Sequence, residues 1–163
     1  MTRSVWMLAG LLVGCGKDGA GGGDYTVDDI DPGVPSGTIG GTAWEMVTAD
    51  VQPDPFDEGT LSVTLYGEEV EACGFATSSD VPFVLFSVAP TVGEYPLSFS
   101  FSEGGQTVTL VVPPSQNNIA TEGLVHVAAV SDTEVEIGLV AVMDDDNSVN
   151  GTFTAERCPE STF

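Results

Sequence analysis

The stretch YPLSFSF (residues 95–101) alternates apolar and polar side chains with a period of two, the pattern of a half-buried β-strand. The dipeptide Gly104-Gly105 follows, and the alternation resumes over residues 108–112. Two alternating runs on either side of a glycine pair predict a β-hairpin. The pair Pro113-Pro114 ends the second strand, because proline has no N–H to donate to a sheet.

The same signals recur on both sides of this hairpin. Residues 61–66 alternate in the same way, and residues 82–89 are almost wholly apolar, as in a strand covered on both faces. Further strands are expected over residues 38–51 with a break at Gly40-Gly41, 122–130, 134–143 and 151–157, and polar loops over 52–59 and 115–121. About eight strands with turn signals roughly 8–12 residues apart predict an all-β fold, an antiparallel β-sandwich with a β-barrel as the alternative.

The beginning of the chain has a different character. Arg3 precedes an apolar run over residues 5–13, and a basic start, a short apolar run and a small-residue cleavage site are typical of a secretory signal peptide. The run closes with Leu12-Val13-Gly14-Cys15, which resembles the lipobox of bacterial lipoproteins. The resemblance implies cleavage before Cys15, a diacylglycerol on its thiol and an acyl group such as palmitate on the new amine. An ordinary cleaved signal peptide with an incidental cysteine is the alternative.

The chain therefore divides into three parts. Residues 1–14 are the expected lipoprotein signal peptide, and residues 15–36 are the lipidated cysteine with a flexible, acidic, glycine-rich tether. Residues 37–163 form the β-sandwich domain. Its two ends, GTIGGTAW (37–44) and GTFTAERC (151–158), are similar to Gram-negative lipoproteins with one small all-β domain, a likeness that implies no activity.

The anchor also predicts where the protein resides. Gly16 follows the cysteine, rather than the aspartate that resembles an inner-membrane retention signal, so we expect the outer membrane. The periplasmic and the surface face both stay open. A membrane contacted through the lipid is thus the first expected partner.

The charge of the chain excludes several classes of function. Twenty-five acidic residues stand against three basic ones, and the formal net charge is −22. Such a surface repels nucleic acid and gives no basic fork for phosphate, so neither nucleic acid nor nucleotide is an expected partner. The two remaining cysteines, Cys73 and Cys158, are expected to form a disulfide in an exported protein, with two buried free thiols as the alternative.

Acidic and amide side chains gather in the last predicted loop, residues 144–150. Oxygen ligands at alternate positions followed by glycine resemble the start of a calcium loop, although Arg157 stands where an EF-hand has its glutamate. We therefore favour a hairpin loop whose side chains cap its own backbone, and no metal or other cofactor. The alternative is a calcium site formed by Asp144, Asp146, Ser148 and Asn150.

The sequence contains few residues of the types that usually serve in catalysis. Its one histidine, His126, lies in an apolar predicted strand, so a nucleophile activated by histidine is not expected. We therefore expect a lipid-anchored envelope protein of binding or structural type, not an enzyme, with a protein, a glycan or a cation as partner. The alternative is an envelope hydrolase that uses paired carboxylates, with or without calcium, on a substrate such as a glycan.

Overall fold

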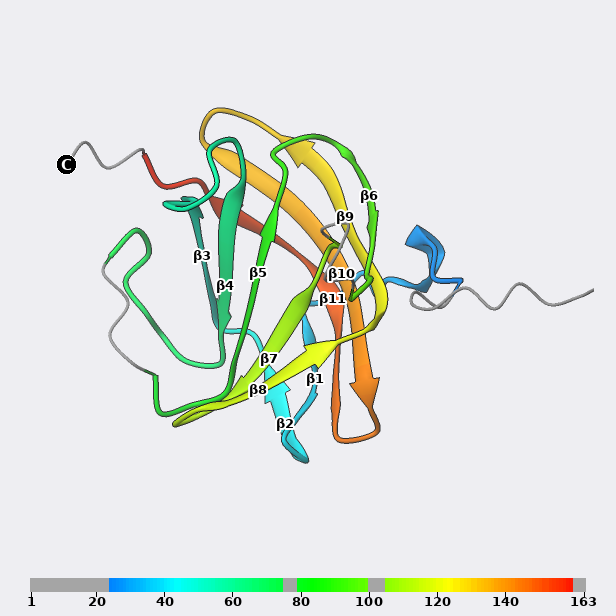
Figure 1. Ribbon diagram of the computed structural model, residues 1–163. Helices are drawn as coiled ribbons and strands as arrows, with labels where there is room; N and C mark the ends of the chain where they lie inside the picture. The colour runs from blue at the N-terminus through cyan, green and yellow to red at the C-terminus, as the bar shows by residue number, and fades with distance from the viewer. Residues whose placement is uncertain (1–23, 75–78, 100–104, 160–163) are drawn as a thin grey trace, which may run out of the picture.

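The computed structural model describes residues 24–74, 79–99 and 105–159. Two antiparallel sheets pack face to face (Figure 1). Sheet A has the order β2-β1-β11-β10-β9-β6, and sheet B has the order β3-β4-β5-β7-β8. The predicted antiparallel β-sandwich is confirmed. The alternative of one closed barrel does not apply, because the strands are divided between two sheets.

The strands follow the alternating runs closely in most places. Sheet A contains β1 (Ser36–Ile39), β2 (Thr42–Glu45), β6 (Gly93–Pro96), β9 (Glu122–Val130), β10 (Glu134–Asp144) and β11 (Asn147–Glu156). Sheet B contains β3 (Thr48–Pro53), β4 (Leu61–Tyr66), β5 (Phe83–Val88), β7 (Val108–Val112) and β8 (Gln116–Ala120). No helix among these described residues is long and apolar enough to cross a membrane.

The core lies between the two sheets and is built by every second residue of their strands. Its largest fully buried members include Val63, Leu65, Val84 and Leu110 from sheet B and Ile137 and Leu139 from sheet A. Since side chains alternate across a strand, the neighbours of these residues point outward. The outer face of each sheet is therefore determined by the same alternation that fills the core.

The predicted hairpin around Gly104-Gly105 is wrong. Strand β6 pairs with β9 in sheet A, whereas β7 pairs with β5 and β8 in sheet B. Leu97, which is completely buried, follows β6 where the chain leaves sheet A. Alternation indicates which face of a strand is buried but not which strand lies beside it, so two adjacent runs can enter different sheets. Residues 100–104 lie outside the described residues.

The polar loop predicted over residues 115–121 is also wrong, because it contains strand β8. Asparagine is uncommon in strands, yet Asn118 is buried here. Its Nδ2 donates to Oδ1 of Asn147 at 2.8 Å, and its Oδ1 accepts from Gln116 Nε2 at 3.0 Å. A partner 29 residues away therefore satisfies the buried amide and permits the strand.

The last part of the predicted flexible tether lies against the outer face of sheet A. Residues 24–35, here called the strap, include a short 3-10 helix over Val27–Asp29. The Asn150 amide donates to Asp29 O and accepts from Asp31 N, both at 2.9 Å, and Thr152 N donates to Gly33 O at 2.7 Å. The prediction of a flexible tether is therefore wrong for residues 24–35. Strand β11 supplies hydrogen-bond partners that this segment does not provide for itself. Residues 15–23 lie outside the described residues.

A substitution at Gly151 would test how the strap is held against sheet A. Its φ is +153°, and an added Cβ would lie 2.5 Å from the backbone of Pro35. Gly151→Ala is therefore expected to displace the strap and to destabilise the fold by about 1 kcal/mol or more. Hydrogen exchange should become faster at the amides of Asp31 and Thr152. Gly33→Ala is the matched control, because a Cβ there meets nothing within 4 Å. Equal exchange in the two variants would contradict this account.

Candidate functional site

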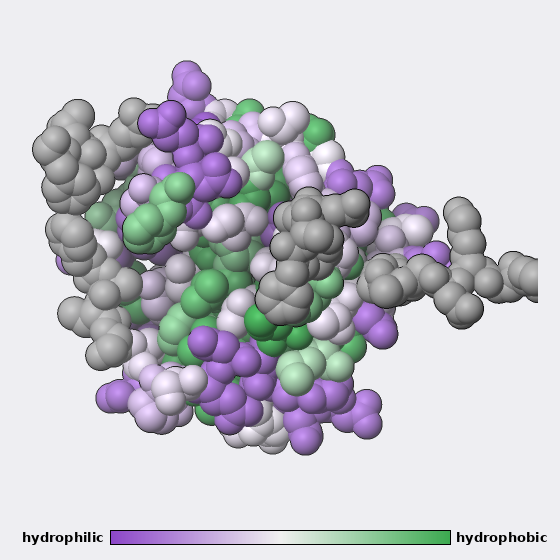
Figure 2. Space-filling view, viewed as in Figure 1, coloured by the Kyte–Doolittle hydropathy of each residue, from purple (hydrophilic) through white to green (hydrophobic). Residues whose placement is uncertain are grey.

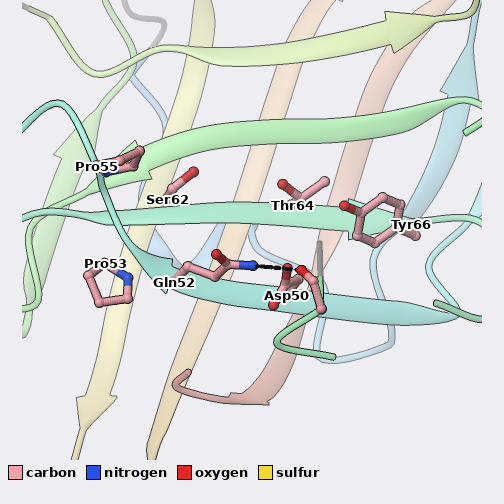
Figure 3. Close-up of a pocket in the computed structure, with 8 residues that line it drawn as sticks. Asp50, Gln52, Pro53, Pro55, Ser62, Thr64 and Tyr66 are labelled. Carbon is pink, nitrogen blue, oxygen red and sulfur yellow. Dashed lines mark hydrogen bonds between the residues drawn. The ribbon is translucent and has the colours of Figure 1, made fainter. Parts of the chain in front are cut away.

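An open hollow of ≈ 230 Å³ lies on the outer face of sheet B, beside its edge strand β3 (Figure 3). Its floor follows from the alternation in β4: Leu61, Val63 and Leu65 enter the core, so the intervening side chains face outward. The lining residues are Asp50, Gln52, Pro53, Pro55, Ser62, Thr64, Tyr66 and Gly74. Cross-strand register places Asp50 opposite Thr64 and Gln52 opposite Ser62.

Asp50 joins the hollow to the disulfide. Its carboxylate is almost buried, with 7% of the residue exposed, and its Oδ1 accepts from the Cys73 backbone N–H at 3.1 Å. Its Oδ2 accepts from Gln52 Nε2 at 2.5 Å. Both oxygens are therefore engaged, as a buried carboxylate requires.

The disulfide lies directly beside this carboxylate. Cys73 and Cys158 are bonded, with their Cα atoms 5.2 Å apart, so the predicted pair is present. Among the described residues, Asp50 and these two cysteines are also the one cluster of potential metal ligands that converges. Because the sulfurs are bonded to each other, they are not available as thiolate ligands. The cluster therefore links strand β3 to the segment that follows β11.

Tyr66 gives the hollow a hydrogen-bond donor. Burial raises the pKa of its phenol, and the Asp50 carboxylate raises that pKa further. The phenol therefore keeps its proton at neutral pH. Its ring also contacts Phe83 on β5, with the ring centroids 6.2 Å apart.

Apolar residues continue across this face of sheet B. Figure 2 shows them at the centre of the face, with hydrophilic residues around them. Cross-strand register places Phe83 between Tyr66 and Val111, and Leu85, which is 39% exposed, between Thr64 and Thr109. The hollow therefore lies between a polar edge at β3 and an apolar centre at β5.

The loop between β3 and β4 forms the rim of the hollow and carries an exposed aromatic ring. Phe56 is 97% exposed and follows the lining residue Pro55. Asp54 holds the loop: it accepts from the Phe56 N–H at 2.9 Å and from the Ser87 hydroxyl at 2.7 Å. These two hydrogen bonds also lower the pKa of Asp54. The ring is thus presented to solvent by an ordered turn.

The residues of the alternative calcium site are only partly brought together. Asp144 and Asp146 share a tight turn between β10 and β11, where Asp146 N donates to Asp144 Oδ1 at 3.0 Å. This is the self-capped hairpin that the sequence favoured, with a shorter loop. Ser148 and Asn150 lie beyond the turn in β11, and the Asn150 amide holds the strap.

Two other residues singled out in the sequence lie away from the hollow. His126 is half-buried in β9 of sheet A, with Glu94 and Gly138 as its cross-strand neighbours. Cys15 and the signal peptide lie outside the described residues. Sequence reasoning missed the hollow itself. The one sequence feature that could have indicated it is Phe56. This phenylalanine follows two prolines and precedes two acidic residues in a predicted loop, where an apolar side chain is not expected to be buried.

The chemistry of the hollow is set by uncharged polar groups. Its described lining offers hydroxyl, amide and backbone groups with one engaged carboxylate, and it contains no basic side chain. Such groups exchange hydrogen bonds with a neutral polar ligand. Comparison with known proteins found no matching family model, no matching curated protein and no matching solved structure.

Proposed function

We propose that the protein is a lipid-anchored envelope protein of binding type, whose binding surface is the outer face of sheet B. The observation that carries this proposal is the position of the hollow relative to the strap. The strap crosses the outer face of sheet A, through Asn150 and Thr152, whereas the hollow lies on sheet B. The strap therefore lies on the side of sheet A, whereas β3 and β4, whose residues line the hollow, belong to sheet B on the other side of the sandwich (Figure 1).

An anchor at Cys15 would exploit this arrangement. Eight residues lie between Cys15 and Asp24, so the nine residue steps of an extended spacer reach about 30 Å. A domain of such negative charge is repelled by anionic headgroups and stands away from them. The hollow would then face away from the membrane, where a ligand can reach it. The lipobox resemblance and Gly16 support the outer membrane as the location.

The alternative of an envelope hydrolase finds less support in this site. Hydrolysis of a glycan by carboxylates needs two of them, one on each side of the scissile bond. Within the described lining of the hollow, Asp50 is the single carboxylate, and both of its oxygens already accept hydrogen bonds. We therefore favour binding, with a protein, a glycan or a cation as the partner.

The anchor is tested by labelling cells with an alkyne fatty acid and following the protein. The wild type is expected to carry the label and to lose residues 1–14, because lipidation precedes cleavage at a lipobox. Cys15→Ser is expected to carry no label and to keep the longer chain. Cys73→Ser is the matched cysteine control and should stay labelled. A labelled Cys15→Ser protein would show that the anchor assignment is wrong.

A further inference from the structure

Phe56 is the most exposed large apolar side chain among the described residues, and its loop is ordered. Asp54 N donates to Thr60 O at 3.0 Å, which closes the loop, and the Asp54 side chain fixes the backbone of Phe56. A phenylalanine that is held in water by a defined turn forgoes the gain of burial. Because the preceding residue, Pro55, lines the hollow, an exposed apolar ring is available in the loop that borders it.

The floor below this rim has the opposite character. Ser62 offers a hydroxyl from β4, Thr64 offers a hydroxyl that is also hydrogen-bonded to the Tyr66 side chain, and Gln52 offers an amide oxygen beside its engaged nitrogen. The described residues supply no hydrogen-bond partner for the Ser62 hydroxyl. Figure 3 shows these side chains along the same two strands, with Pro53 and Pro55 at one end. The hollow thus combines neutral donors and acceptors with apolar ring faces.

We propose that the hollow and Phe56 together bind a neutral saccharide, an inference that rests on the proposed binding function and names its ligand class. A pyranose has hydroxyls at its edge and C–H groups on its faces. The hydroxyls match Ser62, Thr64 and Gln52 on the floor, and the C–H faces match the phenyl ring at the rim.

The volume of the hollow and the charge of the protein narrow the class of ligand further. A volume of ≈ 230 Å³ lies below the roughly 300–1,000 Å³ of sites for drug-sized ligands, and it suits one sugar unit of a longer chain. Acidic saccharides are disfavoured, because a net charge of −22 repels them and the lining holds no basic residue. Arg157 is engaged elsewhere, where its Nη1 donates to Ser131 O at 2.6 Å.

The test uses the full mature chain in a detergent without a sugar headgroup. The probes are neutral hexasaccharides of α-1,4-glucose, β-1,4-glucose and β-1,4-N-acetylglucosamine, with hexagalacturonate as the acidic probe. At least one neutral hexasaccharide is expected to bind at concentrations up to about 10 mM, which would detect a millimolar dissociation constant. NMR shifts should concentrate at the amides of Gln52, Ser62, Thr64 and Gly74.

Two variants distinguish binding at the hollow from nonspecific binding to exposed apolar side chains. Phe56→Ala is expected to weaken binding about tenfold, through loss of the ring contact. Met143→Ala is the matched control: Met143 is 45% exposed but lies on β10 of sheet A, so binding should not change. Both positions are exposed, so both variants should fold.

Three results would overturn the saccharide assignment: no neutral probe binds, hexagalacturonate binds best, or Phe56→Ala binds as well as the wild type. These results are distinguishable from failure of the proposed function. If an envelope protein is captured by the wild type and lost in Phe56→Ala while the saccharides fail, the binding function stands and the ligand class is wrong. The fatty-acid label reports on the anchor independently of both.

Discussion

Replacing Cys73 and Cys158 together by serine is expected to lower the free energy of unfolding by about 4–5 kcal/mol. The bond links residues 85 positions apart, so in the wild type it removes much conformational freedom from the unfolded chain. The variant recovers that freedom, and its unfolded state should become more expanded. Urea denaturation should therefore show a lower midpoint together with a steeper dependence on denaturant.

The wild type treated with a strong dithiol reductant is the control for this experiment. Its midpoint should fall to that of the double variant if the loss comes from the bond and not from serine. The hollow should also loosen, because Gly74 forms part of its wall and follows Cys73 directly. An unchanged midpoint after complete reduction would contradict the role given to the bond.

Leu65→Ala is expected to cost about 2–5 kcal/mol of unfolding free energy. Leu65 is completely buried between the sheets, so its truncation removes apolar contacts and leaves a cavity in a close-packed core. Leu85→Ala is the matched control on the neighbouring strand, where the side chain faces outward and is 39% exposed. That variant should cost less than about 1 kcal/mol.

Equilibrium denaturation of the two leucine variants gives the comparison directly. The two midpoints should differ while the dependence on denaturant stays the same, because neither change alters the bond or the compactness of the unfolded state. Similar losses in both variants would mean that the inward and outward faces of sheet B have been assigned wrongly.

Local patterns predicted most strands but not their partners. The runs over β4 and β9 match their strands in both bounds, because burial of alternate side chains leaves a direct trace in the sequence. Strand β8 left no such trace, since its buried Asn118 depends on Asn147. Strand pairing and the strap depend equally on contacts between distant segments, such as Asn150 with Asp31. These contacts are properties of the folded chain.

The candidate site was predictable to a smaller extent. The bond between Cys73 and Cys158 was predicted from the expectation of export and from the two cysteines that remain once Cys15 is assigned to the lipid. The hollow did not, because each of its residues is ordinary in its own strand. It exists because the pairing of β3 with β4 sets Asp50 beside Thr64, and because the bond brings Gly74 against the same edge. The residue pattern within any one segment therefore does not predict that these residues come together.

The strap also determines how the protein would respond to mechanical force. Tension applied at Cys15 would reach the hydrogen bonds made by Asn150 and Thr152 before it reached β1. Their rupture would free the twelve residues of the strap, whose fully extended length is about 40 Å, while the sandwich stayed intact. In a protein anchored at Cys15 as proposed, the strap would thus act as an extensible segment that protects the sandwich from force transmitted through the anchor.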